Sequence, residues 1–269
     1  MYGILARQSI GSLFLGGIIP GLLIGFGLML MNHLICLKRG YEFRQKRGTI
    51  KGVFKAAYIS FGALIMPVII IGGITSGICT ATEAGVVAVV YGFLFGTIVT
   101  RALKLKHIPQ ILIKSAEISA MVMYIIAMAS LFSHILSRLH FQRIIIVEIL
   151  KITEVPILAV LLVMVFLLFL GLFIDPTAMI VMFAPTLASL GEQLGYNPIH
   201  FGVFIIIVML IGAVTPPVGS MLFISCSIAK ITIEESIIVL LPFILILVLV
   251  ALLVLFIPKI VLLIPSFFY

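Results

Sequence analysis

The sequence contains no tryptophan, a single aspartate and only three cysteines, and charged residues make up 10% of its 269 residues. Soluble domains carry about 25% charged residues, so this charge content excludes an ordinary water-soluble protein. Cys36, Cys79 and Cys226 are odd in number, far apart and lie in or beside apolar segments. This spacing indicates neither a disulfide framework nor a metal site, and buried free thiols are expected.

The same scarcity argues against an enzyme. An intramembrane aspartyl protease requires two aspartates, and Asp175 is the only one. A zinc protease requires a helix with two histidines one turn apart, and the sequence has no such pair. Ser133 and His134 are adjacent and would therefore lie on different faces of a helix. We predict a protein that is not an enzyme and has no cofactor.

Apolar residues dominate what is present. They make up 63% of the chain, the mean hydropathy is +1.40, and apolar segments extend from end to end. We therefore predict an all-α integral membrane protein in which residues 1–269 form a single membrane domain in a lipid bilayer. The net charge of +8 does not indicate nucleic acid as a partner, because the basic residues lie between apolar segments, as membrane topology requires.

The apolar segments predict about six membrane crossings and one re-entrant hairpin. Residues 155–190 are interrupted at 171–177, and the second arm (178–190) spans only about 20 Å as a helix, which is too short to cross. We interpret this region as the hairpin, and the mixed basic and apolar residues 137–152 as an interfacial helix. The predicted crossings are residues 9–35, 56–76, 82–100, 118–136, 201–228 and 237–263.

Basic residues indicate the orientation. The loop 38–55 carries seven Lys/Arg against the single acid Glu42, which predicts a cytoplasmic location. A second basic stretch, residues 101–114, is predicted to lie on the same side of the membrane. The turn over residues 230–236 is also predicted to be cytoplasmic. This arrangement puts 12 Lys/Arg inside and five outside, and the bias modestly favours it.

Two prolines and two glycines interrupt the apolar run 201–228. Adjacent prolines cannot donate backbone hydrogen bonds and they block the preceding helical turn, so we predict a broken helix at residues 212–219. Open backbone in a membrane is tolerated where it is buried in protein or lines a cavity, and in transporters such breaks bind ions and substrate. The alternative is a kink repaired by neighbouring helices.

Four collinear segments resemble one known family, the large membrane subunit of tripartite ATP-independent periplasmic (TRAP) transporters. They are SIGSLFLGGIIPGLL (9–23), GGITSGICTATEAGVVAVVYG (72–92), LGYNPIHFGV (194–203) and IGAVTPPVGSMLF (211–223). The resemblance implies a sodium-coupled permease for organic acid anions, such as dicarboxylates, sialic acid or keto-sugar acids, in the bacterial inner membrane. It also implies three partners: a small membrane subunit, a periplasmic substrate-binding protein and a further half of the large subunit.

Members of this family consist of two inverted repeats and are thought to work as elevators. This sequence resembles only the second repeat together with the last crossing of the first. On that interpretation, residues 1–37 form the last crossing of the first repeat and residues 38–55 form the basic loop. The second repeat then consists of scaffold helices (56–136), the interfacial arm helix (137–152), and the transport hairpin, broken helix and last helix (153–269). The alternatives left open are a fragment of a split subunit, a half completed by a separate polypeptide, and a non-transporting scaffold.

The broken helix supplies the first site candidates. An unwound backbone exposes carbonyl oxygens, and a bare sodium ion is bound by oxygen. The resemblance to the family extends residue for residue through Thr215, Pro216, Pro217 and Gly219. The sodium candidates here are the hydroxyl of Thr215 and the carbonyls of Gly212, Thr215 and Val218, and the substrate candidates are Pro216, Pro217 and Gly219.

The hairpin tip supplies the second set. A charge within the bilayer costs about 2.5 to 3.5 kcal/mol, so the lone Asp175 requires a reason. It could lie near a cation, with Gly171 as a further sodium candidate and Thr177 as a hairpin candidate, or it could cap the helix that follows. Both interpretations stay open. Elsewhere, Thr80 and Glu83 predict a capping box.

Overall fold

A computed structural model describes residues 1–40, 49–139, 144, 147–148, 151, 153, 155–216 and 219–268. The chain is helical, and the described residues contain no strand. They form two compact units, which we call unit 1 (residues 1–34 and 121–269) and unit 2 (residues 35–120). Within the described part, four helical stretches are long and apolar enough to cross a membrane, namely Ile10–Arg39, Ala81–Val99, Ile108–Leu136 and Ile233–Phe256. The chain is thus an all-α membrane protein, as predicted.

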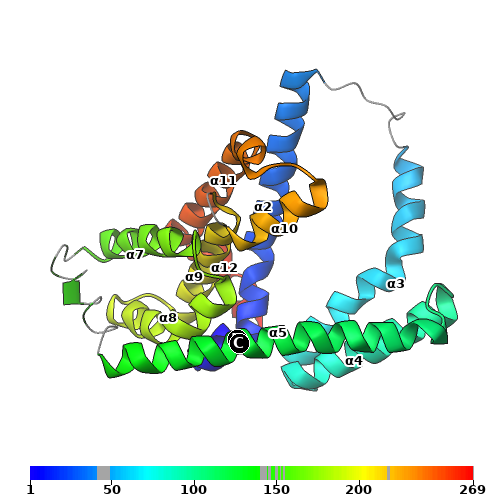
Figure 1. The fold of residues 1–269 in the computed structure, drawn as a ribbon, viewed down its shortest axis with the longest axis horizontal. Coiled ribbons are helices and arrows are strands. Elements are labelled where there is room, and N and C mark those ends of the chain that lie inside the picture. The colour runs from blue at the N-terminus through cyan, green and yellow to red at the C-terminus, as the bar shows by residue number, and fades with distance from the viewer. Residues whose placement is uncertain are drawn as a thin grey trace. The chain divides into compact units, whose positions relative to one another are not determined.

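Unit 1 is organised around helix α9 (Pro198–Val214). Helices α7 (Pro156–Gly171), α8 (Pro176–Gln193) and α11 (Ile233–Phe256) all pack against it (Figure 1). The short α12 (Lys259–Leu262) also contacts α9, and the N-terminal turn α1 (Tyr2–Leu5) contacts α8. The remaining helices that enter this unit are α2 (Ile10–Arg39), α5 (Ile108–Arg138) and α10 (Ser220–Ala229).

The core of unit 1 is densely packed around α9. In lipid there is little hydrophobic drive between helices, so association depends on close van der Waals packing and small residues. Gly191 and Gly202 provide this closeness, since a Cβ on either would lie 2.5 Å from the ring of Phe201 or Tyr2, respectively. The largest fully buried side chains of the unit include Leu167, Met179, Leu190, Phe201, Phe204 and Met209.

Local signals account for the helix starts in unit 1. Helix α9 begins after Asn197, whose side-chain oxygen accepts hydrogen bonds from the next two free amides, Ile199 N and His200 N. Helix α11 begins at Ile233 rather than at the predicted 237, because Thr232 and Glu235 form a capping box. The predicted extension of this crossing to 263 is also wrong, since α11 ends at Phe256, two residues before Pro258.

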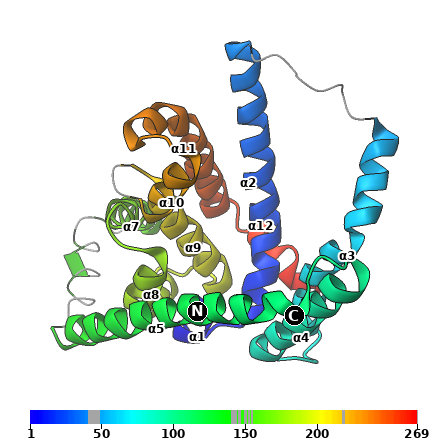
Figure 2. The same ribbon diagram turned by 45° about the vertical axis from the view of Figure 1, so that its right-hand side comes forward.

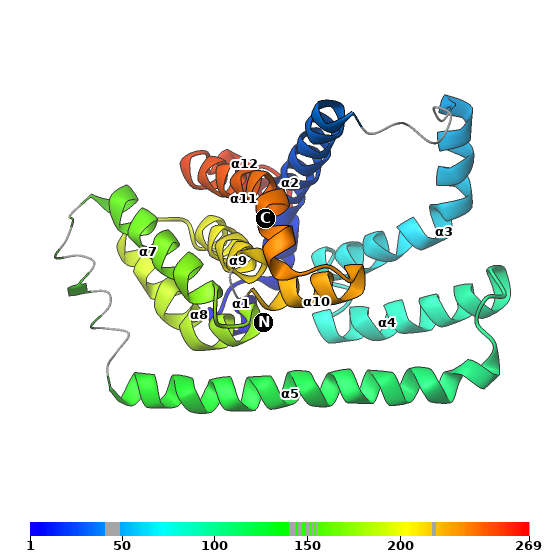
Figure 3. The ribbon, with the colours of Figure 1, turned by 45° about the horizontal axis from the view of Figure 1, so that its top comes forward.

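Unit 2 contains an antiparallel pair, α3 (Ile50–Thr75) and α4 (Ala81–Leu94), followed by the π-helical turn η1 (Phe95–Val99) and the short 3₁₀ helix η2 (Leu105–His107). Figure 3 shows α3 and α4 side by side. The Tyr91 hydroxyl donates to the Gly62 carbonyl at 2.7 Å, and the Phe95 ring lies against Gly62. The capping box of Thr80 and Glu83 is confirmed.

Several predicted boundaries differ from the structure. Helix α5 begins at Ile108, ten residues before the predicted crossing, because its first turns carry polar residues that hydropathy alone does not assign to a membrane helix. Part of the predicted basic loop is likewise helical, since α2 extends to Arg39 and α3 starts at Ile50. The predicted interfacial helix falls largely outside the described residues. The division into scaffold and transport segments stays a prediction.

Candidate functional site

The predicted break in the helix is present. Helix α9 ends at Val214, Thr215 is extended (φ −87°, ψ 130°), and α10 begins only at Ser220. The change of direction between α9 and α10 is visible in Figure 2. Of the predicted candidates in this segment, Pro217 and Val218 lie outside the described residues.

The two prolines determine which carbonyl groups the break leaves without helical partners. In an α-helix each carbonyl accepts from the amide four residues later. The carbonyls of Gly212 and Ala213 face Pro216 and Pro217, which have no N–H to donate. Thr215 compensates in part, because its amide donates to the Gly212 carbonyl at 3.1 Å. The prediction of a free Gly212 carbonyl is wrong in this respect.

The hydroxyl of Thr215 has a defined partner as well. It donates to the Ile211 carbonyl at 2.6 Å and thereby replaces the helical bond that the Thr215 amide does not make. The proton of the hydroxyl is used in this bond, whereas its oxygen keeps lone pairs for another ligand. Thr215 therefore both terminates α9 and presents an oxygen at the break.

Two backbone oxygens converge beside Gly219. A Cβ at this position would lie 2.6 Å from the Ala213 oxygen and 2.9 Å from the Thr215 oxygen. Among the described residues, no hydrogen-bond donor is bonded to either oxygen. Any other residue than glycine at 219 would place a carbon atom against both. The Ala213 carbonyl was not predicted from the sequence, although the proline four residues later was a usable signal.

The hairpin tip contacts the broken helix through two glycines. A Cβ built on Gly171, the last residue of α7, would lie 2.7 Å from the Gly212 Cα, and the reverse distance is also 2.7 Å. Both glycines are buried. Helices can approach this closely only where neither has a side chain, so α7 and α9 meet backbone to backbone. The structure thus brings two predicted sodium candidates together.

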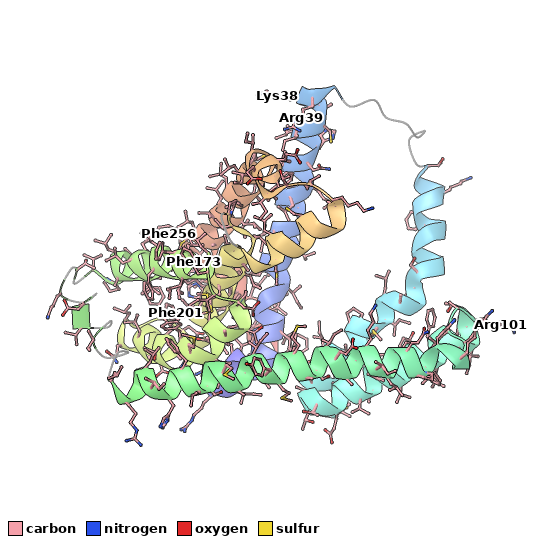
Figure 4. All side chains as sticks on the ribbon, viewed as in Figure 1. Lys38, Arg39, Arg101, Phe173, Phe201 and Phe256 are labelled. Carbon is pink, nitrogen blue, oxygen red and sulfur yellow. The ribbon has the colours of Figure 1, made fainter. Side chains whose placement is uncertain are left out.

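The other tip residues are arranged around the start of α8. Asp175 is its N-cap residue, and Oδ1 accepts from the Thr177 amide at 2.8 Å, so the capping interpretation is confirmed. The turn before it contains Phe173, which Figure 4 labels and whose side chain is 60% exposed. Across the hairpin, the rings of Phe166 and Phe183 meet edge to face at 6.1 Å, which joins its two arms.

The partial charges at these helix ends favour a cation. The C-terminal end of a helix carries roughly half a negative charge. Gly171 ends α7 and Gly212 lies in the last turn of α9, so two negative ends meet at the glycine contact. The N-terminus of α8, which four residues separate from the end of α7, has the opposite sign and suits an anionic group. One hairpin tip therefore offers environments for ions of both signs.

The donor set suits a hard cation. The groups at the break are backbone carbonyl and hydroxyl oxygens, which alkali and alkaline-earth ions prefer, whereas transition metals favour imidazole and thiolate. No cluster of three or more His, Cys, Asp or Glu that could hold a metal occurs in the part of the chain that the structure describes. Residues and geometry are therefore compatible with sodium as a transported ion.

Comparisons with known proteins identify the family of the chain. The model of the family "Tripartite ATP-independent periplasmic transporter, DctM component" matches residues 1–260. The chain is 37% identical to the sialic acid TRAP transporter large permease protein SiaM of Vibrio cholerae, over 86% of this chain and 54% of that protein. It is 33% identical to the C4-dicarboxylate TRAP transporter large permease protein DctM of Pseudomonas aeruginosa, over 91% of this chain and 57% of that protein.

A third relative is a longer protein. The isethionate TRAP transporter permease protein DctMQ of Oleidesulfovibrio alaskensis is 37% identical, over 91% of this chain and 38% of its own length. The chain thus spans between 38% and 57% of these three relatives. They are transporter subunits and not enzymes, in agreement with the prediction. By the family match and these identities, the chain belongs to the DctM component family of tripartite ATP-independent periplasmic transporters.

Proposed function

We propose that this chain supplies the hairpin and the broken helix of a sodium-coupled permease that takes up organic acid anions. The observation that carries the proposal is the convergence of the Ala213 and Thr215 oxygens beside Gly219. Unwound carbonyls and helix C-terminal ends are the groups that bind coupling ions in secondary transporters. Sodium is the coupling ion, and the mechanism requires no cofactor.

The names of the relatives and the electrostatics of the hairpin tip support the proposed substrate class. Sialic acid, C4-dicarboxylates and isethionate, which appear in the names of the relatives, are all organic anions. The N-terminus of α8 offers a positive partial charge to such an anion. Thr177, one residue into α8, is positioned for the same role. These features support an anion site next to the cation site at one tip.

The proposed setting is the bacterial inner membrane. There the chain works with a small membrane subunit, a periplasmic substrate-binding protein and a further half of the large subunit. Sites in inverted-repeat transporters are shared across the repeat interface, so the other half of the large subunit contributes further ligands. The hairpin enters the membrane and returns in this arrangement, and the elevator motion carries it across.

Sodium binding can be tested on the chain itself. Thermal unfolding of the purified full chain is measured in NaCl and in choline chloride at the same ionic strength. A ligand that binds only the folded state raises its stability, by about 1.4 kcal/mol at ten times its Kd. We expect sodium to raise the melting temperature of the wild-type chain. Gly219→Ala abolishes the increase, because its methyl group meets both oxygens.

Two further variants make the test specific. Thr215→Val removes the hydroxyl and weakens the sodium effect, whereas Thr215→Ser keeps the hydroxyl and preserves it. Gly21→Ala is the matched control for the added methyl group, since a Cβ there has no atom within 4 Å. An equal melting temperature of the wild type in both salts contradicts the sodium site.

Transport is tested separately in proteoliposomes that contain the complete system. Uptake of labelled sialic acid, succinate and isethionate is measured with the corresponding binding protein, with and without a sodium gradient. We expect sodium-dependent uptake of one of them, and a higher half-saturating sodium concentration for Thr215→Val. Sodium binding without uptake of any of the three anions would retain the ion site and reject the proposed substrate class.

A further inference from the structure

The net charge of the chain is confined to one of its two units. Residues 35–120 contain 11 Lys/Arg and three Glu, which gives a net charge of +8. The other unit, residues 1–34 and 121–269, contains six Lys/Arg and six Asp/Glu and is neutral. The charge of the whole chain is therefore the charge of unit 2.

Along the sequence, most of the basic residues of unit 2 adjoin the beginning of α3 or the end of η1. Helices α3 and α4 are antiparallel, as the contact of Gly73 with Cys79 at one end and the contact of Gly62 with Phe95 at the other show. The start of α3 and the end of η1 therefore point in the same direction. One basic group precedes and opens α3, and the other follows η1. Glu83, in contrast, lies at the opposite end, in the capping box.

Most of these cations are exposed and form no salt bridge among the described residues of their unit. Figure 4 shows Lys38 and Arg39 at the end of α2 and Arg101 at the turn that leads to α5. Apart from Arg39, the described basic side chains have no carboxylate within 4 Å among the residues that the structure covers. All of them are exposed, namely Lys38, Lys51, Arg101, Lys104, Lys106 and Lys114.

Exposed apolar side chains adjoin these cations. Phe54 is 72% exposed near Lys51, Val99 is 65% exposed two residues before Arg101, and Leu112 and Ile113 are 63% and 61% exposed beside Lys114. Cations at the border of an apolar surface match the boundary between acyl chains and headgroups of a bilayer. If the partner were an acidic soluble protein, it would neutralise the cations but leave the exposed apolar side chains uncovered.

We propose that the basic end of unit 2 binds anionic phospholipid headgroups in the mature protein. The positive-inside rule explains why basic loops stay in the cytoplasm during insertion, but it requires no lipid contact afterwards. Headgroup binding differs from the positive-inside effect in three ways: it persists after insertion, it depends on the charge of the lipid, and it weakens as the salt concentration rises. The neutral unit 1 has no comparable attraction to the leaflet.

The experiment measures lipid selectivity of the finished protein. The full chain is reconstituted in phosphatidylcholine vesicles that contain a trace of spin-labelled phosphatidylglycerol or spin-labelled phosphatidylcholine. The ratio of the two immobilised fractions gives the preference for the anionic lipid. One cation near a headgroup favours an anionic lipid about fivefold, so we expect a preference of about twofold or more when averaged over all contacting lipids. The preference falls between about 0.1 M and 1 M salt.

A matched pair of variants locates the effect. The quadruple variant combines Arg101→Gln, Lys104→Gln, Lys106→Gln and Lys114→Gln. It keeps the first basic loop, which is enough to set the orientation in the membrane. We expect the logarithm of the phosphatidylglycerol preference to fall by roughly a third in this variant. The control variant Arg7→Gln, Arg138→Gln, Lys230→Gln and Lys259→Gln removes the same charge from unit 1 and keeps the wild-type preference. An equal loss in both variants overturns the proposal. A wild-type ratio of one also overturns it, and would indicate an acidic protein surface as the partner instead.

Discussion

The two units differ in how they bury their apolar residues. Unit 1 has a contiguous core in which Phe204, Ile205 and Val208 of α9 are completely buried. In the described part of unit 2, only Ala84 and Ala88 are buried, and most large apolar side chains are exposed. A packed interior can exclude lipid and hold open backbone in a fixed geometry, whereas an exposed apolar surface needs an outside partner. The proposed ion site therefore lies in the unit whose interior could hold it, which is unit 1.

The difference also appears in the glycine contacts. In unit 1, Gly171 and Gly212 meet through their backbones, so no side chain can move aside. In unit 2, Gly62 meets the ring of Phe95, which can be replaced. A contact between backbones fixes the distance between two helices, but a contact with a ring fixes only how that ring packs. Four sets of variants can break or sharpen this comparison.

The largest effect is expected for Gly171→Ala. The added methyl group meets the Gly212 backbone at 2.7 Å, so α7 and α9 must separate, at a cost of about 1 to 3 kcal/mol. The melting temperature of the full chain falls, and sodium stabilisation falls with it. Gly17→Ala is the control, because open space surrounds that position. Equal melting temperatures for Gly171→Ala and wild type would mean that the two helices do not meet in this way.

A smaller and reversible effect is expected in unit 2. Gly62→Ala clashes with the Phe95 ring and destabilises the unit by about 1 to 2 kcal/mol. The second substitution Phe95→Leu removes the obstacle, so the double variant regains part of the lost stability. No truncation rescues Gly171→Ala, since its obstacle is backbone. Additive losses in a double-mutant cycle at 62 and 95 would contradict the proposed contact.

The third prediction separates charge from capping at Asp175. Asn caps a helix as well as Asp does, whereas loss of the cap in Asp175→Ala costs about 1 kcal/mol. We expect Asp175→Asn to keep its stability in choline chloride. A weaker sodium effect in this variant would reveal a role for the carboxylate charge. In unit 2, Thr80→Ala loses about the same cap energy and leaves the sodium effect unchanged.

The smallest effect concerns two basic residues with left-handed backbones. Lys230 (φ 56°) follows α10 in unit 1, and Arg101 (φ 52°) follows η1 in unit 2. This conformation favours glycine, so Lys230→Gly and Arg101→Gly each gain up to about 1 kcal/mol in the melting experiment. Because Arg101 also belongs to the basic end of unit 2, only its substitution lowers the phosphatidylglycerol preference. Equal changes in lipid selectivity would refute that distinction.

Features encoded within a few residues were predictable from the sequence. The break after Val214, the interruption before Pro176 and the capping box at Thr80 each follow from prolines or from capping spacing, and the structure has all three. Hydropathy alone misplaced the start of α5, since its first turns are polar and still helical. The capping box of α11, formed by Thr232 and Glu235, is a local sequence signal that lies before the predicted boundary at residue 237.

The tertiary parts of the site were not predictable in the same way. The contact of Gly171 with Gly212 joins residues 41 positions apart, and no local pattern specifies such a pair. The convergence of the Ala213 and Thr215 oxygens depends on how the chain turns at Gly219, which one sequence does not reveal. The Gly212 carbonyl and the Thr215 hydroxyl each have a local hydrogen-bond partner that the sequence pattern did not predict, and both stay predicted sodium candidates.

Helix α9 is fastened at its beginning as well as at its end. The Nε2 atom of the buried His200 lies 2.7 Å from the Val254 carbonyl, and a neutral imidazole that donates to this oxygen ties α9 to α11. At the other end, the last turn of α9 rests on α7. Sliding or tilting α9 would break one of these attachments. Helices α7, α9 and α11 are therefore joined to one another and would have to travel as a single body in the proposed elevator motion.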